Sequence, residues 1–322
     1  MTGKGRAGAR GSQAKGALCE DVLMLVHPLP GTNRVQLRDT LANISQKLGN
    51  LRGGASPTWE ERLFQYLDWA DEAARQLSHV VRAEDIERLV LTRRYYVLLN
   101  MVGVAGSRSD VGRVVNGLLN LEMDTQVRAF EQAQEALRRV ISRWSSLAMF
   151  MAFDTNVFMR HPVKFLEIDF EALIAEAGAQ HELAQGGGRI HLLLPAVVVA
   201  ELDRLKEAKS RDHQRWRCGY TLAVLDKTFT DPTAPAALPL PEDATAPRPS
   251  EVTVELLIDP IGHVPLPVND DEIIDRLLAA QDLAARKITL VTYDTHMSTK
   301  ARKEGLAVIK LDIEIGDEPA RR

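Results

Sequence analysis

Four acidic residues in the second half of the chain stand where a parallel sheet would bring them together: Asp154, Glu201, Asp270 and Asp294. Asp154 and Asp294 follow apolar runs of strand length, whereas Glu201 and Asp270 lie in the early turns of helical stretches. In an open α/β sheet the site lies beyond the carboxyl ends of the strands. Carboxylates gathered there need a cation to offset their charge, and oxygen ligands favour Mg²⁺ or Mn²⁺. The pattern therefore predicts a divalent metal site.

The third of these positions has several candidates. Asp270, Asp271 and Asp275 all open one predicted helix. Asp270 is nearest to a strand end, whereas Asp271 and Asp275 share a helix face because four residues separate them. A carboxylate here can also serve only as favourable charge at the helix amino terminus. Asp270 is the principal prediction and Asp271 an accessory one.

The elements that must position these residues begin after Ser146. Apolar runs of strand length alternate there with helical stretches, which predicts a parallel sheet covered on both faces. The segment 231–250 contains six prolines and little apolar periodicity. We predict a mobile loop for it, inside the domain, because proline cannot continue a helix or a central strand. The expected strands are 150–153, 190–195, 252–258, 288–293 and 306–311.

The first half of the chain has a helical pattern. Residues 1–17 are rich in glycine, alanine and basic residues and are expected to be a disordered tail. Residues 18–147 are expected to form a helical bundle. One helix is predicted to start at Ser56 and Pro57, a second to run from about Ala83 to Leu98, and a further stretch to form one long helix or two.

Composition and charge narrow the class of protein. With 322 residues, 45% hydrophobic and 26% charged, the chain can bury substantial cores, and its length suggests about two domains. The net charge of -4 is uneven, because residues 1–150 carry about four more basic than acidic residues and the rest about eight more acidic ones. The two cysteines show no metal-type spacing, and no apolar run reaches the ~20 residues of a membrane span. A cytoplasmic protein without a membrane segment is expected.

Four blocks, DTNVF, PAVVVAELDRLK, NDDEIIDRLL and VTYDTHMSTKAR, occur in order between about Met149 and Leu311. Together they resemble the PIN domain of metal-dependent nucleases, and the last block is similar to PIN domains of RNA-decay endonucleases. The resemblance implies a three-layer α/β/α domain with a parallel sheet over 148–315, preceded by the all-α domain. It also implies that Asp154, Glu201, Asp270 and Asp294 form the acidic quartet, with Asp271 accessory.

The activity implied by this resemblance is Mg²⁺- or Mn²⁺-dependent hydrolysis of single-stranded RNA, leaving 5′-phosphate and 3′-hydroxyl ends. Thr155, Asn156 and Thr292 would orient the site or the scissile phosphate. Trp216 is a candidate for stacking on an unpaired base. A protein partner or a second copy is expected to use the helical domain. The basic residues expected to contact RNA are Lys206, Lys209, Arg211, Arg215, Arg217, Lys300 and Arg302.

Other classes fit the residues less well. A receiver domain needs an acidic pair after its first strand, and a haloacid-dehalogenase-type phosphatase needs D-x-D there, but Asn156 occupies the second place. A non-catalytic scaffold would be expected to have lost at least one carboxylate. The remaining alternative, a toxin ribonuclease of a toxin–antitoxin pair, is typically a compact single domain. The helical region that precedes the α/β domain in the chain favours an enzyme of RNA processing or decay over a toxin.

Overall fold

The computed structural model describes residues 25–29, 31–54, 58–104, 109–207, 212–241, 250–259 and 263–312. The chain divides into two compact units. One contains the described residues of Met1–Ser145 together with Asp282–Ala285, and the other contains Ser146–Gln281 and the described residues from Arg286 onward. The tail predicted for residues 1–17 lies outside the described residues.

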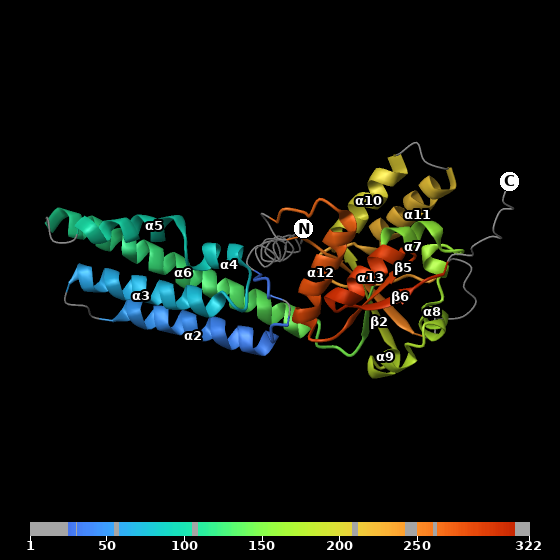
Figure 1. Ribbon diagram of the computed structural model, residues 1–322, viewed down its shortest axis with the longest axis horizontal. Helices are drawn as coiled ribbons and strands as arrows, with labels where there is room; N and C mark the ends of the chain where they lie inside the picture. Colours follow the sequence, from blue (N-terminus) through green and yellow to red (C-terminus); the bar gives the residue numbers. More distant parts are fainter. Residues whose placement is uncertain are drawn as a thin grey trace, which may run out of the picture. The chain divides into compact units, whose positions relative to one another are not determined.

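The first unit is helical. Helices α2, α3 and α6 run alongside one another and contact each other pairwise, and α4 and α5 pack on α6 (Figure 1). The elements are α2 (Arg34–Gly53), α3 (Trp59–Leu77), α4 (Ala83–Leu89), α5 (Arg93–Asn100), a 3-10 turn at Met101–Val104 and α6 (Ser109–Arg143).

The core of this bundle contains one face of α3. Leu63, Tyr66 and Ala70 are fully buried along α3. Trp69, whose indole N–H donates to the carbonyl of Ile44 at 3.1 Å, is buried with them and stacks on Tyr66. These aromatic residues therefore build the core.

The start of α3 differs from the prediction. Thr58 is the cap residue, and its hydroxyl accepts the backbone N–H of Glu61 at 3.2 Å. Ser56 and Pro57, the predicted start, lie outside the described residues, and α3 as described begins at Trp59. Thr58 can cap the helix because its hydroxyl, like that of a serine, can accept a free N–H in the first helical turn.

The helix predicted from Ala83 to Leu98 is two helices, so that prediction was wrong. Helix α4 ends at Leu89, and Thr92 begins a new helix by accepting the backbone N–H of Tyr95. The Thr92 hydroxyl also donates to the buried carboxylate of Glu122, which pairs with Arg94 at 2.9 Å. This long-range contact favours the break. The final stretch forms one helix, α6.

The second unit is an α/β domain. Its strands are β1 (Met149–Phe153), β2 (Arg189–Pro195), β3 (Ala236–Ala237), β4 (Glu251–Leu257), β5 (Ile288–Thr292) and β6 (Ala307–Lys310). Its helices are α7 (Thr155–Arg160), α8 (Phe170–Glu176), α9 (Gln180–Gln185), α10 (Ala196–Glu207), α11 (Asp212–Thr228), α12 (Asn269–Ala284) and α13 (Thr295–Glu304), with a 3-10 turn at Phe165–Glu167.

The six strands form one sheet in the order β3-β4-β2-β1-β5-β6, and every pair except β3–β4 is parallel. From β1 the chain first adds β2 and β4 on one side and later returns to β5 on the other. The strand order therefore reverses at β1. In such sheets ligands bind at this point, beyond the carboxyl ends of the strands.

Both faces of the sheet are covered. All residues of β1 and β5 are buried, as are all of β2 except its first. Helices α7, α10 and α11 pack together, and α13 contacts β5 and β6. Strands buried on both faces are the mark of a parallel sheet between helical layers. The predicted α/β/α domain, which follows a helical domain in the chain, is confirmed.

One part of the proline-rich segment 231–250 is not a loop. Ala236 and Ala237 pair with β4 as the antiparallel edge strand β3, and the N–H of Leu238 donates to Val252 at 2.9 Å. Leu238 is buried. The prediction failed here because the prolines flank the pairing residues, and an edge strand tolerates proline beside it.

Among the described helices none is both long enough and apolar enough to cross a membrane.

Candidate metal centre

Asp154 and Asp294 follow the two strands that meet where the strand order reverses. Phe153 pairs with Val291, and the N–H of Asp154 continues the ladder by donating to the Val291 carbonyl at 3.0 Å. The hydroxyl of Thr292 donates to Asp154 Oδ2 at 2.7 Å and accepts the backbone N–H of Asp294 at 2.9 Å. Thr292, itself fully buried, therefore joins the two acidic positions.

Glu201 reaches the same place from α10, which starts directly after β2. Its Oε2 accepts the hydroxyl of Thr155 at 2.7 Å, in the residue that follows Asp154. Its Oε1 lies 3.3 Å from Arg204, one helical turn on. The contact with Thr155 directs the Glu201 carboxylate toward the end of β1.

The electrostatics show that Asp270 belongs to this group. Burial raises the pKa of Asp154 to about 6, and the charges of Asp270 and Glu201 act in the same direction, against the hydrogen bond from Thr292. Burial also raises the pKa of Asp270, as do Asp294, Glu201 and Asp271. Asp270 and Glu201 therefore lie near enough to Asp154 for their charges to make it harder to ionise, and Asp294 and Glu201 act on Asp270 in the same way.

The other candidates in α12 have different partners. Asp271 forms an ion pair with Lys300 of α13, and Asp275 pairs with Arg276 at 2.9 Å. Asp271 remains close enough to raise the pKa of Asp270. Asp270 has no hydrogen bond or ion pair among the described contacts, so it is the α12 carboxylate that these contacts leave for a ligand.

Thr155, Asn156 and Thr292 direct their polar atoms toward the acidic residues and the strand ends. The side-chain oxygen of Asn156 accepts the backbone N–H of Tyr293 at 3.1 Å, and its amide nitrogen lies 3.5 Å from Thr292 Oγ1. Between the two roles predicted for these residues, orienting the site or holding a phosphate, their contacts favour the first.

The basic residues predicted to contact RNA have varied environments. Lys206, Arg215 and Arg302 are exposed, although Lys206 and Arg215 lie within 4 Å of Asp203 and Asp212. Lys300 is engaged with Asp271. Lys209 and Arg211 lie outside the described residues.

Arg217 does not belong to this group, so its prediction was wrong. It is buried, and its guanidinium donates to the carbonyls of Phe158, His161 and Val163. Arg217 therefore satisfies the carboxyl end of α7. Its neighbour Trp216 is 53% exposed and stacks on Tyr220, with ring centroids 5.4 Å apart.

Two residues near the acidic group were missed. His296, in the first turn of α13, lies close enough to Asp270 for its charge to lower that carboxyl's pKa. Arg204 pairs with Glu201. The i,i+3 spacing of Glu201 and Arg204 is a signal that could have identified the second residue. His296 had no such signal, because its neighbour Asp270 belongs to a different helix.

The donor set fits a hard divalent cation. It consists of carboxylate oxygens, which favour Mg²⁺ or Mn²⁺, and it gathers negative charge that burial makes costly unless a cation offsets it. The doubly covered parallel sheet, with acidic residues beyond its strand ends, defines the class of protein as an α/β domain with a candidate divalent-metal site.

Within that class, residues 151–312 match the family model of the PIN domain, over half of the chain. The chain belongs to the PIN domain family. PIN domains are typically metal-dependent nucleases, and they generally use divalent metals. No curated protein matches the chain.

Proposed function

We propose that this protein is an endoribonuclease that cuts single-stranded RNA, in RNA processing or decay, and depends on Mg²⁺ or Mn²⁺. The observation that carries the proposal is the placement of Asp154, Glu201, Asp270 and Asp294 around the point where the strand order reverses. Burial raises the pKa of Asp154 and of Asp270, and the charges of other members of the group act in the same direction. A family that is typically nucleolytic supplies the reaction class.

In this proposal the four carboxylates hold the metal, with Asp271 as an accessory. When bound, the ion supplies Lewis-acid stabilisation of charge on the phosphate and lowers the pKa of the attacking water. The chain's own residues set the geometry. Thr155 orients Glu201, and Thr292 orients Asp154. Such supporting hydrogen bonds fix ligand direction and matter nearly as much as the ligands.

The proposed substrate class rests on an aromatic pair carried by α11. Trp216 and Tyr220 stack with their ring planes 15° apart, and Lys164 lies 5.9 Å from the centre of the Tyr220 ring. An exposed aromatic platform beside basic side chains suits an unpaired base and its phosphate. The helix α11 that carries it contacts α10, on which Glu201 stands. These features favour single-stranded RNA over a duplex.

The cellular location and the role of the helical unit stay predictions. We propose a cytoplasmic location, and Cys218, which is buried, forms no disulfide among the residues that the structure describes. Binding of a protein partner or a second copy by the helical unit is a separate prediction, which sedimentation of the full-length chain would check.

The proposal is tested by cleavage of end-labelled single-stranded RNA and DNA by the full-length chain. RNA should be cut internally, with 5′-phosphate and 3′-hydroxyl ends, because a metal-activated water does not need the 2′-hydroxyl for attack. EDTA should stop the reaction, and Mn²⁺ should restore it. Asp154→Asn and Asp294→Asn should each abolish cleavage, and Asp203→Asn, an exposed carboxylate of α10, is the matched control.

Three results would contradict the proposal. They are ends with a 2′,3′-cyclic phosphate, cleavage that survives EDTA, and normal turnover by both Asp154→Asn and Asp294→Asn. Cutting of DNA in preference to RNA would keep the metal chemistry and overturn the substrate.

A further inference from the structure

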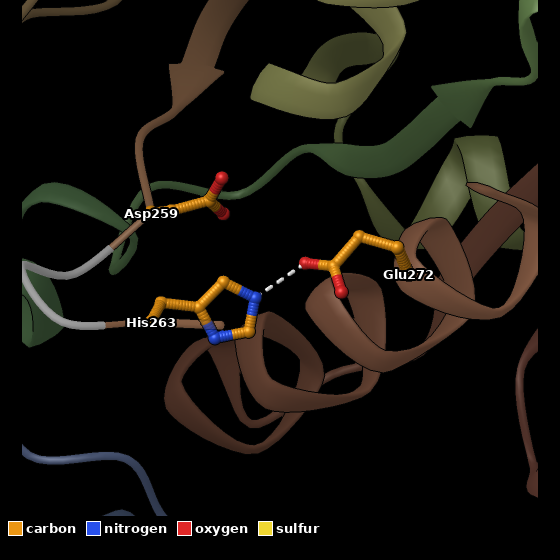
Figure 2. A group of neighbouring side chains, drawn as sticks. All are labelled: Asp259, His263 and Glu272. Atoms are coloured by element: carbon orange, nitrogen blue, oxygen red, sulfur yellow. Dashed lines mark hydrogen bonds and ion pairs between the residues drawn. The ribbon is translucent and has the colours of Figure 1, made fainter. Parts of the chain in front are cut away.

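A second group of potential metal ligands lies in the connection between β4 and α12. Asp259 stands two residues after β4, His263 lies further along the connection, and Glu272 is in the first turn of α12. Figure 2 shows the imidazole of His263 directed at Glu272, with Asp259 extending from the end of the strand. The group shares no residue with the acidic cluster of Asp154, Glu201, Asp270 and Asp294.

The geometry of this group suits a small cation. One ligand atom from each of the three side chains lies within 4.8 Å of the other two. His263 Nε2 and Glu272 Oε1 are 2.6 Å apart. A Zn²⁺ ion with bonds of about 2.1 Å in tetrahedral geometry needs ligand atoms roughly 3.4 Å apart. The His263–Glu272 pair therefore has to open by less than roughly 1 Å to admit the ion.

One polar atom of the group has no partner. Asp259 Oδ1 is buried, and no hydrogen bond reaches it from the residues that the structure describes. Glu272 is 1% exposed, and its second oxygen, Oε2, accepts the backbone N–H of Leu266 at 2.8 Å. A buried carboxylate oxygen without a donor is costly. A cation held between Asp259 and Glu272 would satisfy it.

The local charges leave room for a divalent ion. Three carboxylates, those of Asp259, Glu272 and Asp275, act on one another here, and their permanently charged partner is Arg276. Arg276 Nε lies 3.6 Å from Glu272 Oε1 but makes its shorter contact, 2.9 Å, with Asp275. The closer carboxylate contact of Arg276 is therefore with Asp275, which leaves the carboxylates of Glu272 and Asp259, beside His263, as candidate ligands of a cation.

We propose that Asp259, His263 and Glu272 form a second metal site, which binds Zn²⁺. An imidazole nitrogen with carboxylate oxygens suits zinc, whereas Mg²⁺ takes oxygen ligands almost alone. The ion would tie the connection after β4 to the first turn of α12, the turn on which Asp270 also stands. The inference does not depend on the proposed nuclease activity, because none of its ligands belongs to the acidic cluster.

The site is tested by titrating the full-length, EDTA-treated and dialysed protein with ZnCl₂ against a chromophoric chelator. Excess Mg²⁺ is present throughout, to occupy the acidic cluster. The variants are His263→Ala, Asp259→Asn, the double variant Asp154→Asn/Asp294→Asn, and His181→Ala as a matched control, since His181 is an exposed histidine of α9. Circular dichroism of each variant checks that it is folded.

We expect one tightly bound Zn²⁺ per chain in the wild type, in His181→Ala and in the double variant. His263→Ala and Asp259→Asn should each bind at least about tenfold more weakly, since even the loss of a supporting residue around a metal costs that much. If His263→Ala fails to fold, Asp259→Asn carries the comparison, because it keeps the size of the side chain.

Three outcomes would overturn the proposal. Zinc affinity unchanged in both His263→Ala and Asp259→Asn would remove the assigned ligands. Loss of binding in the double variant alone would place the ion in the acidic cluster. No zinc binding by the wild type would leave the three side chains as a hydrogen-bonded network.

Discussion

At the residue scale, burial of Asp154 makes the stability of the metal-free protein depend on pH. The pKa of this carboxyl is raised from 3.8 to about 6, so the folded state holds the proton more tightly than the unfolded chain. The stability from this carboxyl is therefore fully present below pH 3.8 and is lost as the pH rises to about 6. The loss amounts to roughly 3 kcal/mol.

Asp154→Asn should therefore stabilise the EDTA-treated protein at pH 7.5, by up to roughly 3 kcal/mol, and have little effect at pH 4. Asparagine keeps an oxygen that can accept the Thr292 hydroxyl. Urea unfolding at both pH values measures the difference, with Asp203→Asn as an exposed control. An equal gain at both pH values would show that repulsion and desolvation of the Asp154 charge are not the cause.

Three aspartates of α12, Asp270, Asp271 and Asp275, should differ in their effect on cleavage. Asp270→Asn should be the most damaging, because Asp294 and Glu201 act directly on this carboxyl. Asp271→Asn should cost less, since Asp271 is paired with Lys300, and Asp275→Asn least, since Asp275 is paired with Arg276. Single-turnover cleavage rates at saturating Mg²⁺ give the order. A rate lowest for Asp275→Asn would mean that the ligand on this helix has been misassigned.

At the element scale, the approach of α9 to β1 depends on a glycine. A Cβ atom on Gly186 would lie 2.4 Å from the backbone nitrogen of Met149 and 2.7 Å from the carbonyl carbon of Ala148. Backbone atoms at the start of a central strand cannot move aside cheaply. Gly186 therefore permits the turn after α9 to pack against β1, the strand that leads to Asp154.

Gly186→Ala should destabilise the protein by about 1–3 kcal/mol, the usual cost of an overpacked contact. Gly219→Ala is the control, because Gly219 lies within helix α11 of the same unit and its Cβ would meet only a flexible lysine side chain at 4.0 Å. That change should be neutral or stabilising by up to ~1 kcal/mol. Chemical denaturation of both variants gives the comparison, and a Gly186→Ala protein as stable as Gly219→Ala would refute the packing argument.

At the scale of the whole molecule, charge rather than shape should dominate the affinity for RNA. The chain has a net charge of -4, so binding has to come from local groups such as Lys206, Arg215 and Arg302. Each phosphate that they neutralise releases counterions, and the binding constant should fall with salt with a logarithmic slope of about -0.7 per contact.

Fluorescence anisotropy of labelled single-stranded RNA, measured with Asp154→Asn so that no cleavage occurs, should therefore show steeply weaker binding as salt rises. Lys206→Ala/Arg215→Ala should flatten the slope by roughly one to two contacts, whereas Arg75→Ala, an exposed arginine of α3, should not. A slope near zero, or one that the Lys206/Arg215 variant leaves unchanged, would remove these residues from the RNA surface.

Local patterns were sufficient to predict the element types and the strand-end acids. Apolar runs of strand length alternating with helical stretches specify a parallel sheet, because the periodicity belongs to each segment and does not depend on its neighbours in space. Asp154 and Asp294 could be placed at strand ends for the same reason. The preference for Asp270 over Asp271 and Asp275 came from chain position alone, and it stays a prediction.

Such local patterns could not predict which polar side chains contact partners that are distant in the chain. In the sequence RWR, Arg217 is typical of an exposed basic residue. It is buried instead, and its guanidinium donates to carbonyls at the carboxyl end of α7. Thr92 breaks an otherwise continuous helical pattern while bonding Glu122, thirty residues away. Periodicity determines which face of a segment is apolar, whereas the partner of each polar side chain depends on packing between segments that are far apart in the chain.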